Sequence, residues 1–133
     1  MVQRAWPLLA GAMVWLAIVA VCALIARESW PEYLAAEPDR NFDLTMRIGR
    51  LLTGAVASVV AGALVARLAG PDRKAVPIAA WLLFLISTID HIRPEVWNAY
   101  PVWYHLVFLG YLVPLTLLGG RLVQPGATIN TPT

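Results

Sequence analysis

Four long runs of apolar residues, each free of charged side chains, constrain this sequence more than any other feature. They cover residues 8–25, 51–66, 76–89 and 106–120. The hydrocarbon core of a bilayer is about 30 Å thick and takes about 20 residues of α-helix to cross. A helix satisfies its own backbone hydrogen bonds in lipid, and the runs lack the alternation of a barrel strand. The sequence therefore predicts an all-α integral membrane bundle of four transmembrane helices.

The predicted spans cover residues 7–26, 44–67, 75–91 and 102–123 and form one domain over residues 1–123. The first span is longer than the apolar region of a signal peptide, so we expect it to be retained. Ser29 and Glu32 have the spacing of a capping box around Pro31, which predicts a short outer helix over residues 30–37. Residues 124–133 are polar, and we expect a flexible cytoplasmic tail there.

The overall composition excludes a soluble domain and a disordered chain. Hydrophobic residues make up 59% of the sequence and charged residues 14%, whereas soluble domains average about 25% charged residues. The single cysteine, Cys22, allows neither an intrachain disulfide nor a zinc motif built on cysteine pairs. The net charge of +2 is small and no basic cluster is interleaved with aromatic residues, so we expect no nucleic-acid partner.

The distribution of charge predicts the orientation of the chain. The N-terminus, the loop 67–76 and the C-terminal flank together contain five basic residues and one acidic residue. The segments 27–50 and 90–101 contain five arginines and seven acidic residues. Positive charge stays on the cytoplasmic side, so we expect both termini in the cytoplasm of a bacterial-type inner membrane. Aromatic residues on the other side form a predicted interfacial belt, namely Trp30, Tyr33, Trp97, Tyr100, Trp103 and Tyr104.

The second span has a face of small residues, Gly54, Ser58, Ala61 and Gly62. This spacing lets two helices approach closely in lipid. One interpretation is a face through which copies of the chain associate. The other is packing against the first or fourth span of the same chain, which is the more frequent role of small residues in membranes.

Charged residues near the outer ends of the spans form a predicted outer polar cluster: Arg47, Arg50, Asp90 and Glu95. An arginine that faces hydrocarbon is costly, so Arg47 and Arg50 need a polar partner. They can extend to lipid phosphates at the interface. The sharper hypothesis is an ion pair between one of these arginines and Asp90, which would join the second and third spans.

His91 and His105 are expected at comparable depth on neighbouring spans. Two neutral imidazoles so placed could hold a haem b axially, or bind a metal together with Asp90 or Glu95. Each span offers only one histidine, and histidines near an interface more often hydrogen-bond to backbone or headgroups. We therefore expect no cofactor, and keep haem b or a metal at His91 and His105 as an alternative.

The apolar runs contain no ionisable residue at mid-depth, which argues against an ion-coupled transporter, and no catalytic motif is present. We expect a non-catalytic inner-membrane protein that is an accessory or assembly subunit, or a self-associating scaffold. Its partners would be the lipid bilayer and other membrane subunits or a second copy. The alternatives are the histidine cofactor protein and a small oligomeric channel or carrier. The path of that channel would be lined by Arg47, Arg50, Thr53 and Ser58, whose arginines would favour anions.

Overall fold

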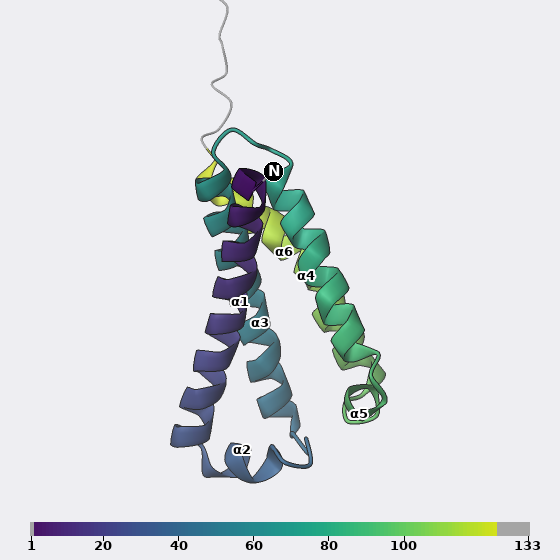
Figure 1. Cartoon of the computed structure of the whole chain (residues 1–133). Coiled ribbons are helices and arrows are strands. Elements are labelled where there is room, and N and C mark those ends of the chain that lie inside the picture. Colours follow the sequence, from purple (N-terminus) through teal and green to yellow (C-terminus); the bar gives the residue numbers. More distant parts are fainter. Residues whose placement is uncertain (1, 125–133) are drawn as a thin grey trace, which may run out of the picture.

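Helices account for all the regular structure in the computed structural model of the protein, which describes residues 2–124 (Figure 1). Four helices are long: α1 (Val2–Ser29), α3 (Leu44–Ala69), α4 (Ala75–His91) and α6 (Val102–Val123). Two are short, α2 (Pro31–Ala36) and α5 (Pro94–Trp97). The helical fold class is as predicted. By length and composition α1, α3 and α6 can cross a membrane, whereas α4 is a shorter apolar helix of 17 residues.

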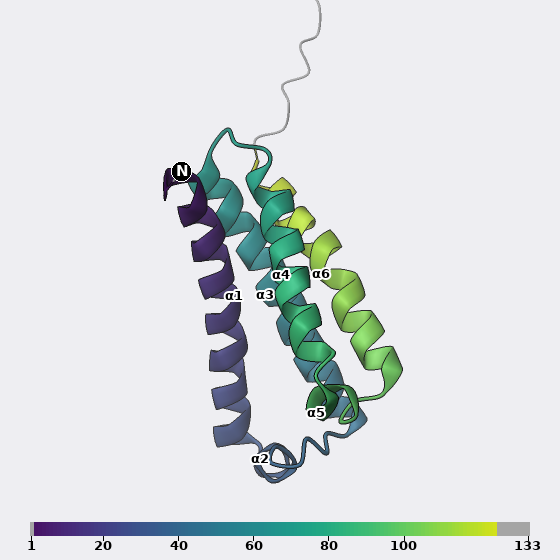
Figure 2. The same ribbon diagram turned by 45° about the vertical axis from the view of Figure 1, so that its right-hand side comes forward.

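The four long helices form a bundle with two different ends. The start of α1, the connection between α3 and α4, and the last turn of α6 lie at one end (Figures 1 and 2). The short helices α2 and α5 lie at the other, which we call the α2/α5 end. Helix α3 contacts α1, α4 and α6, so it is the central helix of the bundle.

Glycine lets α3 and α6 approach each other backbone to backbone. A Cβ atom on Gly62 of α3 would overlap the carbonyl oxygen of Thr116 in α6. A Cβ atom on Gly119 of α6 would in turn overlap the carbonyl oxygen of Val59 in α3. No side-chain rotation relieves an overlap with backbone, so glycine is required on both helices at this crossing.

The rest of the small-residue face of α3 is also covered by the chain itself. Gly54 lies against Phe108 of α6, and Ser58 accepts a hydrogen bond of 3.1 Å from Trp15 Nε1 of α1. Ala61 is 1% exposed. In the structure this face therefore packs against α1 and α6 of the same chain. Association of two copies through Gly54, Ser58, Ala61 and Gly62 is wrong, because α1 and α6 already occupy the face.

Some local predictions differ from the structure. The first helix continues to Ser29, three residues beyond the predicted end of the first span. Trp30 is therefore the N-cap of α2, and its side chain makes no capping hydrogen bond, so the capping box is wrong. Helix α5 was not expected from the sequence. Residues 125–133 of the predicted tail lie outside the described residues.

We predict that Gly62→Ala destabilises the protein in detergent by about 1–3 kcal/mol, because α3 and α6 must move apart to admit the methyl group. The matched control is Gly110→Ala in α6, where no atom of another helix lies within 4 Å of the added Cβ. That change should be neutral, or stabilise by up to about 1 kcal/mol through helix propensity. Thermal unfolding of both variants measures the difference, and equal stability would show that the α3–α6 crossing is not tight.

Candidate functional site

A cavity of about 430 Å³ lies near the α2/α5 end of the bundle, and we call it the Arg50 pocket. It is lined by residues of α1, α3 and α6, by Asp90 and His91 at the end of α4, and by residues of α2, α5 and the adjoining loops. The volume falls in the range of about 300–1,000 Å³ typical of small-molecule sites. Along α1 the lining runs from Trp15 to Ala26, which is about 16 Å of helix. The aromatic residues of the lining are Trp15, Trp30, Tyr33, Tyr100, Tyr104 and Phe108.

Arg50 is held at the pocket by aromatic side chains. Its Nη1 donates a hydrogen bond of 2.6 Å to the Tyr33 hydroxyl. Its Cζ lies 4.8 Å from the centre of the Phe42 ring and 6.0 Å from that of Tyr100, a cation–π arrangement. The Arg50 Nε is buried and has no acceptor among the described residues. The aromatic groups orient the guanidinium, but none of them carries a neutralising negative charge.

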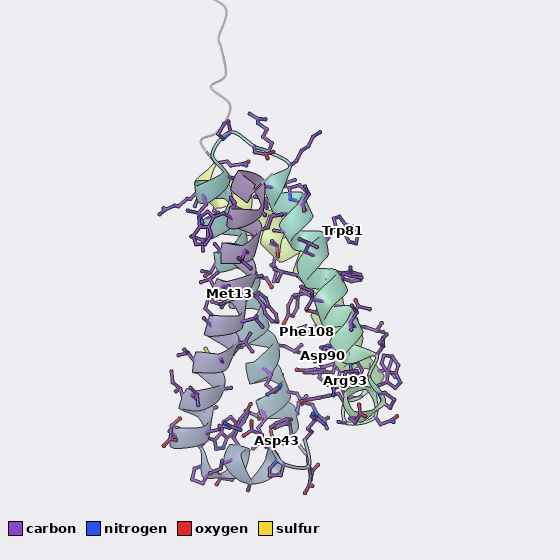
Figure 3. All side chains as sticks on the ribbon, viewed as in Figure 1. Met13, Asp43, Trp81, Asp90, Arg93 and Phe108 are labelled. Carbon is purple, nitrogen blue, oxygen red and sulfur yellow. The ribbon has the colours of Figure 1, made fainter. Side chains whose placement is uncertain are left out.

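The predicted ion pair between Asp90 and Arg47 or Arg50 is wrong. Asp90 pairs with Arg93 at 3.3 Å, and Glu95 lies 3.8 Å from the same guanidinium (Figure 3). Arg93 is only three residues from Asp90 in the sequence, so it forms an ion pair with this carboxylate locally. Within residues 2–124, neither Arg47 nor Arg50 of α3 forms an ion pair. The predicted outer polar cluster is therefore divided, since Arg50 and Asp90 line the pocket but Arg47 and Glu95 do not.

Several residues of the predicted aromatic belt are in fact core residues of the site. Tyr33 and Tyr104 are each 4% exposed and Tyr100 is 8% exposed. Burial raises the pKa of Tyr100, so its phenol stays neutral and acts only through hydrogen bonds and its ring. Phe42 stacks between Tyr33 and Tyr100, with ring centres 5.1 and 6.1 Å apart. Phe42 was missed by sequence reasoning, because a single aromatic residue in a polar loop carries no pattern.

The two histidines lie side by side and form a hydrogen bond between their rings. His91 Nδ1 lies 2.8 Å from His105 Nδ1, and His105 Nε2 lies 3.2 Å from the Trp97 carbonyl oxygen. A carbonyl only accepts, so His105 carries its hydrogen on Nε2 and, when neutral, accepts at Nδ1. His91 must then donate from Nδ1. In this arrangement only Nε2 of His91 keeps a lone pair for a ligand.

This geometry bears on the cofactor alternative. The two Nδ1 atoms face each other at 2.8 Å in a hydrogen bond, which uses the proton of one and the lone pair of the other, so neither can bind a metal unless this hydrogen bond breaks. Axial ligation of a haem by both rings would require this hydrogen bond to break. In the described part of the chain, no group of three or more His, Cys, Asp or Glu residues is placed to hold a metal.

The residues predicted to line a channel have separate roles. Arg50 and Thr53 line the pocket, whereas Arg47 and Ser58 do not. Ser58 accepts from Trp15 and donates a hydrogen bond of 2.7 Å to the Gly54 carbonyl oxygen. Trp15 is the lining residue of α1 farthest from the α2/α5 end, so the pocket reaches the middle of the bundle and meets this α1–α3 contact.

Comparison with known proteins identifies no relative, since no protein-family model, no curated protein and no solved structure matches the chain. The functional conclusion therefore depends on the geometry of the bundle and of the Arg50 pocket.

We predict that nitrogen NMR of histidine-labelled protein at pH about 9, where imidazole is neutral, shows two different tautomers. His105 should be protonated at Nε2 and His91 at Nδ1, because the Trp97 carbonyl fixes the first ring and the first ring fixes the second. The chain has only two histidines, so a His91→Phe variant assigns the spectrum. Protonation of His105 at Nδ1 would show that the two rings do not bind each other in this way.

Proposed function

We propose that the chain is a multi-pass integral membrane protein with four spans, α1, α3, α4 and α6. The supporting observation is the outward surface of the bundle. Large apolar side chains are exposed on all four long helices, for example Met13 at 59% and Leu52 at 62%, and the middle of each helix lacks charged residues. A soluble monomer rarely exposes contiguous apolar area of this kind, whereas lipid is the solvent that such a surface requires.

The shortest span, α4, fits the same proposal. Its 17 residues lie at the lower limit for crossing a bilayer, which is about 17–25 residues. Pro77 lies in its first turn, where a missing backbone N–H costs little. Helix α4 also packs on α6 and α3, and burial against these helices reduces the surface that lipid must cover.

For the orientation, we propose that both termini face the cytoplasm and that the α2/α5 end faces outward. The start of α1, the loop between α3 and α4, and the last turn of α6 share one end of the bundle (Figure 2). That end has the excess of basic residues in the sequence, as the cytoplasmic side of an inner membrane protein does.

We further propose that the protein is non-catalytic and acts as an accessory or assembly subunit, or as a scaffold that binds copies of itself. Polar side chains in the middle of the bundle are used in contacts between or within helices. Ser58 accepts a hydrogen bond from Trp15. Tyr111 donates one of 2.7 Å to the Leu51 carbonyl oxygen, and Thr116 donates one to the Leu112 carbonyl oxygen. Such contacts fix the bundle and leave its outward faces for partners.

Helix α1 supports a docking role more than the other helices do. Only 6% of the residues in its most apolar window are buried, compared with 44% for α3 and 28% for α6. A helix whose own residues are so little buried by the bundle offers a long apolar face to another membrane helix. Another subunit or a second copy would bury this face.

We predict that the full chain, purified from membranes in a mild detergent, retains a stoichiometric membrane partner or a second copy. Met13→Trp on the exposed face of α1 should disrupt that association, because the larger ring keeps a partner helix away. The matched control Leu85→Trp, on a residue of α4 that is 55% exposed, should leave it intact. Mass spectrometry and light scattering measure partner and stoichiometry. A monomer without a bound protein before any substitution would contradict the subunit proposal.

A further inference from the structure

The charge of Arg50 has no counter-ion in the part of the molecule that the structure describes. Its contacts there are with a tyrosine hydroxyl and aromatic rings, and its Nε, like that of Arg47 outside the pocket, is buried without an acceptor. A partly buried cation that lacks an anion is unfavourable, because desolvation is not offset by ionic attraction. The arrangement is therefore incomplete without a negatively charged group in or beside the pocket.

The one acidic residue of the lining, Asp90, does not supply that group. Asp90 lines the pocket, but its carboxylate is engaged by Arg93 at 3.3 Å. The pocket also has a second basic residue, Arg40, in its lining. The two arginines of the lining outnumber the one carboxylate, so the pocket has a positive excess.

The rest of the pocket is suited to hydrocarbon. The wall provided by α1 is apolar and consists of Trp15, Leu16, Val19, Cys22, Ala23 and Ala26. Small side chains leave the space open, notably Ala23 on α1 and Gly49 on α3. The lined length of α1 is about 16 Å, or about half of the 30 Å hydrocarbon core, which corresponds to one leaflet. A free inorganic anion would use Arg50 but would leave this apolar depth empty.

From these observations we propose that the Arg50 pocket binds one phospholipid with an anionic headgroup. Its phosphate accepts hydrogen bonds from Arg50, and one acyl chain lies along α1 between Trp15 and Ala26. The proposal rests on the membrane placement proposed above, because the ligand comes from the leaflet at the α2/α5 end. The apolar surface alone indicates only general contact with lipid. The Arg50 pocket would in addition bind one specific lipid molecule.

The first test compares two arginines of one helix. The full chain is purified in detergent and titrated with dioleoyl phosphatidylglycerol, and bound lipid is counted by native mass spectrometry. One lipid should bind per chain. Arg50→Gln should weaken this binding about tenfold or more, as expected for the loss of charged hydrogen bonds. Arg47→Gln is the matched control: it removes the same charge one turn away, from a residue outside the pocket, and should change binding by less than about threefold. Equal losses in both variants would overturn the proposal.

The second test concerns the acyl chain and remains informative if Arg50→Gln fails to fold. Ala23→Leu fills the pocket from α1 and should also weaken phosphatidylglycerol binding about tenfold, by taking the place of the buried chain. Ala20→Leu, one turn earlier on an exposed part of α1 outside the pocket, should have no effect. Normal binding by the Ala23→Leu variant would contradict the placement of the chain.

Competing ligands distinguish other sources of the anion. Phosphatidylcholine, whose headgroup is neutral overall, should bind more weakly than phosphatidylglycerol. Displacement of phosphatidylglycerol by millimolar inorganic phosphate would identify a free-anion site, and tighter binding of oleate would identify a fatty-acid site. Either result overturns the phospholipid proposal.

Extraction of the membranes with carbonate before purification separates the lipid-binding proposal from the proposed membrane placement. A chain that stays in the membrane but binds no lipid at Arg50 contradicts only this inference, whereas a chain that is washed out contradicts the membrane placement itself.

Discussion

The backbone contact between α3 and α6 fixes how these two helices are aligned, and the candidate site depends on that alignment. Gly62 and Gly119 let these helices cross with carbonyl oxygens at the positions that Cβ atoms would occupy. With the helices locked together there, the second turn of α3 lies beside the first turns of α6. Arg50 is consequently placed near Tyr104 and Tyr100, and the two histidines come within hydrogen-bond distance at the end of α4.

The helices were predictable from the sequence because one physical cause produces them. Charge-free apolar runs of this length must form helices in lipid, and α4 and α6 begin and end at the expected residues. The small-residue face of α3 was also recognisable, but its partner helix was not, because spacing along one helix says nothing about what covers it. The capping box at Ser29 was wrong since the preceding helix had not yet ended: Trp30 N still donates to the Ala26 carbonyl oxygen.

The candidate site was only partly predictable. Sequence position placed His91 and His105 at a common depth, but their direct hydrogen bond depends on ring orientations that only tertiary packing fixes. Charge complementarity favoured an ion pair between Asp90 and an arginine of α3. The Asp90 carboxylate instead pairs with Arg93, three positions along the chain. The surroundings of Arg50 combine a loop residue, Phe42, with Tyr100 from a distant segment, so no local pattern indicated that they would meet.

We propose a lipid environment as the common explanation of the apolar surface, the charge-free middle of the helices and the absence of an anionic partner for Arg50 among residues 2–124. The accessibility of single cysteines tests this explanation most directly. In a Cys22→Ser background, which removes the one native cysteine, Asp39→Cys and Pro71→Cys place exposed thiols at opposite ends of the bundle. An impermeant maleimide applied to intact cells should label Asp39→Cys, and should reach Pro71→Cys only after the membrane is permeabilised. Labelling of Pro71→Cys in intact cells would show that the orientation is the opposite of the one proposed. Equal labelling of both variants in a carbonate-washed supernatant would show that the chain does not lie in the membrane.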